Sequence, residues 1–205
     1  PDTTPEMWDW WFGWHGSENT RYKLWHPKSH LSAEWEDGRV DECYIGRTSI
    51  IKEYIGETAM DAAIQFKSPL DFGFSFDAFN HPEKAIYICA RIGHPKFPVD
   101  FGYLVHQVRV TENGTEMRSR FWMGGKYIHA RRDNIFEKAA VKVLQKIQAL
   151  PEQFAQDLLK HCAEEMNHLA SMLPDIHAKF ANDEEPLAIS GDTFHKGDAN
   201  FEQAV

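Results

Sequence analysis

The sequence predicts an α+β domain in which a long C-terminal helix lies across a curved antiparallel sheet. Three observations lead to this fold class: short β-type runs between about residues 40 and 126, an Asn113-Gly114 pair typical of a hairpin turn, and helical periodicity after Asp133. Strands that precede the helices indicate an α+β architecture, because an alternating order of strands and helices would instead predict a parallel sheet.

The chain begins with a short helix that is rich in aromatic residues. Thr4 is suited to cap this helix, and Pro5 is suited to its first position. Met7, Trp11 and Trp14 follow at helical spacing, and a polar, loop-like stretch comes after them. Strands are then expected at residues 47–55, 60–67, 85–92, 101–110 and 116–123.

Two helices are expected after the strands. The first carries one apolar stripe at the helical period, made by Ile135, Phe136, Ala139, Ala140, Val143, Leu144 and Ile147. Pro151 starts the second helix, which we expect to reach about Met172. The expected organisation is one domain over residues 1–180, followed by a polar, acidic tail over residues 181–205.

Composition excludes several classes of protein. With 205 residues, the chain is long enough to bury a core without disulfide bonds. A net charge of −9 argues against a nucleic-acid partner, and no apolar run approaches the roughly 20 residues that a membrane helix needs. Cys43, Cys89 and Cys162 show no CxxC spacing. We therefore expect a reduced, cytoplasmic protein that has no signal peptide and no membrane partner.

The predicted hairpin places one histidine inside the fold. A turn centred on Asn113-Gly114 sets Val110 opposite Met117 and His106 opposite Phe121, on an apolar face that also carries Ser119. His106 therefore points toward the interior. The alternative is a structural histidine whose ring is satisfied by a neighbouring carbonyl group.

The same alternation places a carboxylate among apolar side chains. Glu53 shares its strand face with Ile51 and Ile55, whereas Lys52 and Tyr54 point the other way. A carboxylate on an apolar face must be paired, protonated or bound to a cation. The alternative is a solvated edge strand, in which neither face is buried.

The last helix adds a His/Glu pair to this set. Its core-facing stripe consists of Phe154, Leu158, His161, Glu165, Leu169 and Met172. His161 and Glu165 lie one turn apart, so they can give two ligands to one divalent metal, and zinc suits this mixture of donors. The alternative is a buried hydrogen bond with a structural role only. The spacing of Glu165 and His168 also occurs in di-iron proteins, but the second such pair that a di-iron site needs is absent from the sequence.

A third histidine is available near the N-terminus. The loop expected over residues 21–30 carries His26 and His30, and loops often hold functional residues. A metal held jointly by this loop, a strand and the last helix would explain why several polar groups point inward.

Two N-terminal segments carry a resemblance to a known family. Trp10-Trp11-Phe12-Gly13-Trp14-His15 and Arg21-Tyr22-Lys23-Leu24-Trp25-His26-Pro27, with His30, resemble the diacetylphloroglucinol hydrolase and phloretin hydrolase family, and the resemblance covers most of residues 7–172. Enzymes of this family cut the carbon–carbon bond between an acyl group and a polyhydroxylated aromatic ring. The resemblance implies a helix-grip, Bet v 1-like fold and one zinc ion held by two histidines and two glutamates.

The resemblance also implies a ligand set. His161 and Glu165 match the helical pair, and His30 matches the loop histidine. For the fourth ligand we choose Glu53 because of its inward face, although Glu57 fits the family's separation from His30 better. Ala33 stands near a position where the family has an amide-bearing residue, and this departure leaves the substrate open.

The remaining site residues are expected around the cavity. His106 and Tyr22 are the candidate catalytic residues, and His94, Phe121 and Trp25 are the candidate substrate contacts. The function implied is zinc-dependent hydrolysis of an acylphloroglucinol-type ketone. The alternatives are a non-catalytic carrier of hydrophobic small molecules with the same fold, and a polyketide cyclase or aromatase. A homodimer is compatible with the sequence, which does not fix the oligomeric state.

Overall fold

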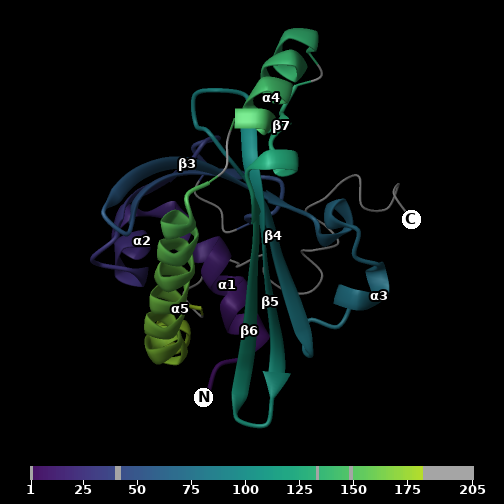
Figure 1. Ribbon diagram of the computed structural model, residues 1–205. Helices are drawn as coiled ribbons and strands as arrows, with labels where there is room; N and C mark the ends of the chain where they lie inside the picture. Colours follow the sequence, from purple (N-terminus) through teal and green to yellow (C-terminus); the bar gives the residue numbers. More distant parts are fainter. Residues whose placement is uncertain (1, 40–42, 133, 148–149, 182–205) are drawn as a thin grey trace.

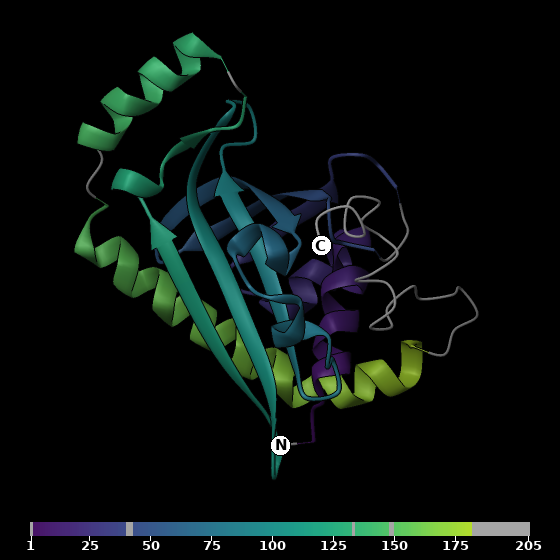
Figure 2. The same cartoon turned by 90° about the vertical axis from the view of Figure 1, so that its right-hand side faces the viewer.

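The computed structural model describes residues 2–39, 43–132, 134–147 and 150–181. One antiparallel sheet runs in the order β1-β2-β3-β4-β5-β6, and β7 pairs with β5. The long helix α5 crosses one face of this curved sheet (Figures 1 and 2). The α+β helix-grip fold is therefore confirmed, and no helix in the described part of the chain is long and apolar enough to span a bilayer.

The elements have the following bounds. The strands are β1 His30–Trp35, β2 Thr48–Ile55, β3 Thr58–Lys67, β4 Ala85–Gly93, β5 Val99–Thr111, β6 Gly114–Met123 and β7 His129–Ala130. The α-helices are α1 Pro5–Trp14, α2 Asn19–Trp25, α3 Phe76–Phe79, α4 Ile135–Ile147 and α5 Glu152–Phe180, and the short 3-10 helices of the described residues are η1 His15–Ser17, η2 Pro69–Phe72 and η3 Gly125–Tyr127.

Helix α1 forms the centre of the core. The Thr4 hydroxyl accepts a hydrogen bond from the backbone N–H of Met7 at 3.3 Å, which confirms the predicted cap. The aromatic side chains of α1 are buried on all sides of the helix, as expected for a helix enclosed by the rest of the fold. The Trp10 ring meets the ring of His177 at 5.1 Å, and the Trp14 ring meets Phe180 at 5.3 Å. The first and last helices therefore share one core.

Helix α5 is longer than the sequence predicted. It continues beyond Met172 and through Pro174 to Phe180. A proline inside a helix removes one backbone hydrogen bond and introduces a steric clash. The aromatic contacts of the last two turns with α1 and the complete burial of Leu173 offset this cost.

The sequence predicted a loop for the polar stretch after α1, but most of this stretch is helical or extended. It forms the seven-residue helix α2 and the strand β1, which begins at His30. A register shift interrupts the pairing of β1 with β2 between His30 and Ser32, so the alternation of β1 is irregular. Short length and irregular alternation explain why the residue pattern does not reveal these elements.

The predicted register of the β5–β6 hairpin is wrong by two residues. Thr111 pairs with Gly114, so the turn residues are Glu112 and Asn113, and His106 pairs with Ser119 instead of Phe121. Gly114 has φ +124°, whereas among described non-glycine residues only Asp2 has positive φ. The turn therefore lacks the two left-handed residues of a type I′ Asn-Gly turn. A slip of two preserves the face of every side chain, so His106 still points inward.

The apolar stripe of α4 does not pack into the core. Ile135, Phe136 and Val143 are 77%, 81% and 56% exposed, whereas Val141 is buried. Helix α4 follows β7 and projects away from the sheet (Figures 1 and 2). The prediction of a helix is confirmed, but α4 lies against β7 and η3 and leaves these three apolar side chains of its stripe exposed.

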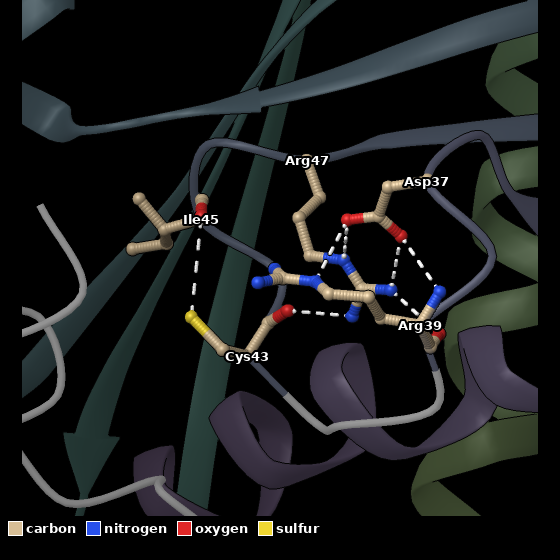
Figure 3. A network of polar contacts seen from close by, with 5 residues as sticks. All are labelled: Asp37, Arg39, Cys43, Ile45 and Arg47. Atoms are coloured by element: carbon tan, nitrogen blue, oxygen red, sulfur yellow. Dashed lines mark hydrogen bonds and ion pairs between the residues drawn. The ribbon is translucent and has the colours of Figure 1, made fainter.

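A polar network fixes the connection between β1 and β2 (Figure 3). The Arg47 guanidinium donates to both carboxylate oxygens of Asp37, at 3.0 and 2.8 Å, and to the carbonyls of Arg39 and Cys43. Its hydrogen bonds lower the pKa of Asp37 to about 2. The Arg47 guanidinium also stacks on the Trp35 ring at 4.1 Å. The network holds the far ends of the two strands that carry His30 and Glu53.

One buried acid makes stability depend on pH. Asp9 on α1 is 5% exposed and accepts a hydrogen bond from the Tyr44 hydroxyl. Burial raises the pKa of Asp9 to about 7, against roughly 4 in an unfolded chain. Because the folded-state pKa is the higher one, the associated stability is present at acidic pH and is lost as pH rises through about 7.

We expect the substitution Asp9→Asn to remove this pH dependence. Its amide oxygen can still accept from Tyr44, but the side chain has no proton to lose. Between about pH 5 and pH 8, the variant should gain stability relative to the wild type by on the order of 2 kcal/mol. Thermal midpoints measured across this range check the result. Glu34→Gln, an exposed change on β1, should leave the slope almost unchanged, and equal slopes for Asp9→Asn and wild type would contradict the assignment.

Candidate metal centre

Three elements bring four polar side chains together beneath α5. His30 opens β1 directly opposite Glu53 on β2, and α5 places His161 and Glu165 one turn apart. All four residues are buried, between 2% and 8% exposed. Strand β2 is paired on both sides, by β1 and β3, so it is not a solvated edge strand.

The ligand atoms of these residues converge on one point. One ligand atom each from His30, Glu53 and His161 lies within 4.8 Å of the others. Glu165 joins them, since its Oε2 lies 3.3 Å from His30 Nε2 and 3.7 Å from His161 Nε2. Glu53 Oε2 lies 3.5 Å from His30 Nε2 and 3.7 Å from His161 Nε2. We call these four residues the His/Glu cluster.

The protonation of the His/Glu cluster is strongly affected by burial. Desolvation raises the pKa of Glu53 to about 7 and raises the pKa of Glu165 well above its ordinary value. It lowers the pKa of His30 and, with the nearby His30 and His26, lowers the pKa of His161 to about 3. Ionising two buried carboxyl groups beside two neutral imidazoles costs free energy unless a positive charge lies between them.

The donor atoms fit a divalent metal ion. His30 Nε2 is buried without a hydrogen-bond partner, although it faces two carboxylates. The other nitrogen of His30, Nδ1, donates to the Tyr22 carbonyl at 2.9 Å, so Nε2 keeps its lone pair. Backbone carbonyls orient metal-binding histidines in this way.

Tyr22 supports two members of the cluster at once. Its hydroxyl donates to Glu53 Oε2 at 2.7 Å, and its ring stacks on His30 at 3.9 Å between ring centres. Helix α2 therefore orients the histidine and the glutamate of the first two strands.

The close approach of the β2–β3 turn to α5 depends on a glycine. Gly56 has φ +59°, and a Cβ at this position would lie 2.6 Å from the Asp157 carboxylate of α5. Glu57 follows on this turn and is exposed, beside an outer hollow that His161 also lines. Glu57 therefore lies outside the His/Glu cluster, whereas Glu53 lies in it.

A largely apolar cavity extends from the cluster under the sheet. His106, Tyr22, Trp25 and Phe121 line it, as the sequence analysis expected, together with Phe12, His15, Ile51, Met60, Ile64, Phe66, Ile92, Leu104, Met123, Phe154 and Leu158. His106 is 4% exposed, and burial lowers its pKa to about 4. The imidazole is therefore neutral at pH 7.

His94 does not reach this cavity. It lies in the turn after β4, where its Nδ1 accepts hydrogen bonds from the backbone N–H groups of Lys96 and Phe97. His94 is therefore not among the residues that line the cavity, although we expected it to contact the substrate there. Its strand ends one residue earlier, at Gly93, so the side chain belongs to a tight turn.

Two other histidines lie beside the site. His15 lines the cavity and was missed as a site residue; its Nδ1 donates to the Trp11 carbonyl at 2.7 Å, and burial lowers its pKa to about 4. Its place at the end of the segment Trp10–His15, which carries the family resemblance, was the signal that could have revealed it. His26 stacks on His161 at 4.9 Å and lies 3.6 Å from the Glu164 carboxylate, on the outer side of the cluster.

Fold and site together define the class: a helix-grip α+β domain whose interior cavity ends at a buried His/Glu cluster able to hold a metal ion. The family model described as "DAPG hydrolase PhiG domain" matches residues 1–178, and the chain belongs to this family.

Two relatives give this family a chemical context. The chain is 32% identical over 193 residues to a 2,4-diacetylphloroglucinol hydrolase of Pseudomonas protegens, an alignment that covers 88% of this chain and 62% of that protein. It is also 32% identical over 193 residues to a 2,4-diacetylphloroglucinol hydrolase of Pseudomonas sp, covering 88% of this chain and 65% of the relative. The chain therefore spans less than two thirds of the length of these curated relatives.

We expect Glu53 and Glu57 to differ in their effect on bound metal. Glu53→Gln removes a carboxylate that faces both histidines, so it should lose most of the metal, whereas the exposed Glu57→Gln should keep it. Elemental analysis of both purified variants gives the answer. Loss of metal from Glu57→Gln alone would show that the spacing from His30 was the better guide.

Proposed function

We propose that this chain is a zinc-dependent hydrolase that cleaves the carbon–carbon bond between an acyl group and a polyhydroxylated aromatic ring, with an acylphloroglucinol as substrate. The observation that carries the proposal is the buried His/Glu cluster at the end of an aromatic-lined cavity. The names of the two relatives support the substrate class.

The donor set supports zinc as the metal. Imidazole nitrogens and carboxylate oxygens are zinc ligands, and four such groups from His30, Glu53, His161 and Glu165 face one another. Two carboxylates balance the charge of a divalent ion inside the protein. When bound there, zinc supplies Lewis acidity for hydrolysis of the acyl group.

His106 is the proposed proton donor to the aromatic ring. The ring is a poor leaving group as a carbanion, so its carbon must gain a proton before or during cleavage. Burial keeps His106 neutral, and a neutral imidazole carries one N–H that can be donated into the cavity. Tyr22, which is held by Glu53, is placed to bind an oxygen of the substrate or assist this transfer.

The aromatic side chains of the cavity would hold the substrate ring. Phe12, Trp25 and Phe121 line the cavity that also contains His106. Flat apolar walls favour a planar ring, while a few polar groups set its orientation.

A non-catalytic carrier of hydrophobic molecules is the second candidate, since most of the cavity lining is apolar. A carrier gains nothing from burying two carboxyl groups, and a polyketide cyclase or aromatase likewise needs the cavity without the cluster. The cluster therefore favours the hydrolase. We also propose a single domain over residues 1–180 and a cytoplasmic location, where the three cysteine thiols would stay reduced. The tail that we expected over residues 181–205 lies, apart from Ala181, outside the residues that the structure describes.

We expect protein purified without added metal to contain about one zinc per chain. Elemental analysis measures the ratio, and His161→Ala provides the control that should lose the ion. A ratio near zero that stays near zero after incubation with zinc would end the proposal of a zinc enzyme and favour the carrier.

We expect His106→Ala and His161→Ala to fail in different ways. His106→Ala should keep its metal and its thermal midpoint close to wild type but slow cleavage of an acylphloroglucinol by roughly 10²-fold or more, the scale of a lost general acid. His161→Ala should lose metal and activity together. Metal content, thermal midpoint and turnover are measured on each variant.

A third variant, His94→Ala, is the matched control, because His94 lies outside the cavity and should tolerate the change at full activity. If His106→Ala keeps full activity, His106 is a structural residue. If it loses its metal, His106 belongs among the ligands and the proposed ligand set is wrong.

A further inference from the structure

The hydrogen bond of His106 leads away from the cavity. His106 lines the cavity on β5, and its Nδ1 lies 2.7 Å from the Ser119 hydroxyl on the neighbouring strand β6. Since Nδ1 is engaged by this hydroxyl, Nε2 is the nitrogen left to act on a substrate. Burial lowers the pKa of His106, and no charged side chain among the described residues contributes to this shift.

Ser119 faces a second hollow on the other side. A groove of about 430 Å³ runs between β6 and α5, and it is lined by Thr3, Trp8, Thr115, Met117, Ser119, Leu159, Cys162, Ala163, Met166, Asn167 and Ala170. Because about 10–15 Å³ of such volume accommodates one water molecule, the groove can hold a chain of waters. It is therefore a water-accessible space that begins where the His106 hydrogen bond ends.

Only a thin partition separates the two spaces. Cys162 lines both the cavity and the groove, and Ser119 lines the groove with it. His106 therefore faces the cavity, Ser119 faces the groove, and the hydrogen bond between them crosses the partition.

We propose that Ser119 is a positioning residue for His106: its hydroxyl donates to Nδ1, keeps the proton of the ring on Nε2, and connects His106 to water in the groove between β6 and α5. The inference rests on the proposed function. A hydroxyl group suits this place because it can donate one proton while it accepts another. Alanine or valine would leave Nδ1 of a buried imidazole without a partner.

Each proton that moves through Ser119 has a source and a destination. When the acyl carbon–carbon bond breaks, its electron pair stays on the ring carbon and takes the proton from Nε2. Nδ1 then takes the Ser119 proton, and Ser119 takes a proton from a groove water. One of the two protons released in the cavity, when water adds to the acyl group and the carboxylic acid ionises, then binds Nε2. Nδ1 returns its proton to Ser119, and Ser119 returns a proton to the groove hydroxide, which restores the water and the starting tautomer of His106. The net reaction is ketone plus water giving arene, carboxylate and one proton.

The first experiment reads the histidine itself and needs no activity. Nitrogen-15 NMR of the purified protein should show His106 with an unprotonated, hydrogen-bonded Nδ1 and a protonated Nε2. Ser119→Ala should shift the Nδ1 signal, and Ser119→Thr, which keeps the hydroxyl and adds a methyl group toward the roomy groove, should restore it. A proton on Nδ1 in the wild type, or signals unaffected by Ser119→Ala, would overturn the proposal.

The second experiment follows turnover of an acylphloroglucinol by the metal-containing protein. Ser119→Ala should lower kcat by about 10-fold, a part of the general-acid contribution, with KM within roughly twofold and metal content unchanged. Ser119→Thr should recover most of the lost kcat. Ser171→Ala, an exposed serine on α5, is the matched control and should match wild type. A Ser119→Thr variant as slow as Ser119→Ala would show that the hydroxyl is not what matters.

The third experiment tests the groove. Ala163→Trp fills it from α5 and should lower kcat without loss of metal, whereas Ala155→Trp, exposed on the same helix and outside the groove, should not. An unchanged kcat in Ala163→Trp would contradict the connection to groove water. If wild-type protein shows no hydrolysis at all, the proposed function fails, while the NMR experiment still decides the role of Ser119.

Discussion

The burial of two carboxyl groups beside two imidazoles is the constraint on which the rest of this structure depends. Glu53 and Glu165 are each 8% exposed, and desolvation of this size is unfavourable unless a cation, protons or both compensate for it. Their positions come from elements far apart in the chain: a strand pair, a helix and a tight turn at Gly56. The fold thus concentrates its least favourable charges where a metal ion can make them favourable.

The aromatic packing of the tryptophan-rich helix α1 offsets the free-energy cost of this burial. Its rings contact α5 on one side and, through Phe12 and Trp11, the ring of Trp25 on the other. Trp25 in turn meets the His30 ring edge-on, with 5.3 Å between ring centres, and the Tyr22 ring stacks on the face of the His30 ring. Large aromatic contacts of this kind hold a ring in one orientation at little entropic cost, so a metal ligand is fixed before any ion binds.

Local periodicity predicted the parts of the site that depend on which face a side chain takes. The inward positions of Glu53, His106 and the His161–Glu165 pair follow from alternation in strands and from helical spacing. That of His106 also survives the two-residue slip in the register of the β5–β6 hairpin. Properties set by tertiary packing were not predictable. They include the strand at His30, the extension of α5 through Pro174 and the exposure of the α4 stripe. Alternation also favoured Glu53 over Glu57, and the structure places Glu53 in the cluster and Glu57 on the exposed β2–β3 turn, whose close approach to α5 at Gly56 no pattern in the chain records.

The shared core of the first and last helices has a consequence for how the molecule is made. His30 and Glu53 lie in the first third of the chain and His161 and Glu165 in the last third of its described part, so the contacts between the two pairs are of long sequence separation. Such topology slows folding, because the chain loses the entropy of loop closure before the distant contacts can stabilise it. During synthesis, the tryptophans of α1 leave the ribosome long before their partner helix exists. The nascent chain must therefore keep an unusually aromatic segment from aggregating until α5 emerges and closes both the core and the His/Glu cluster.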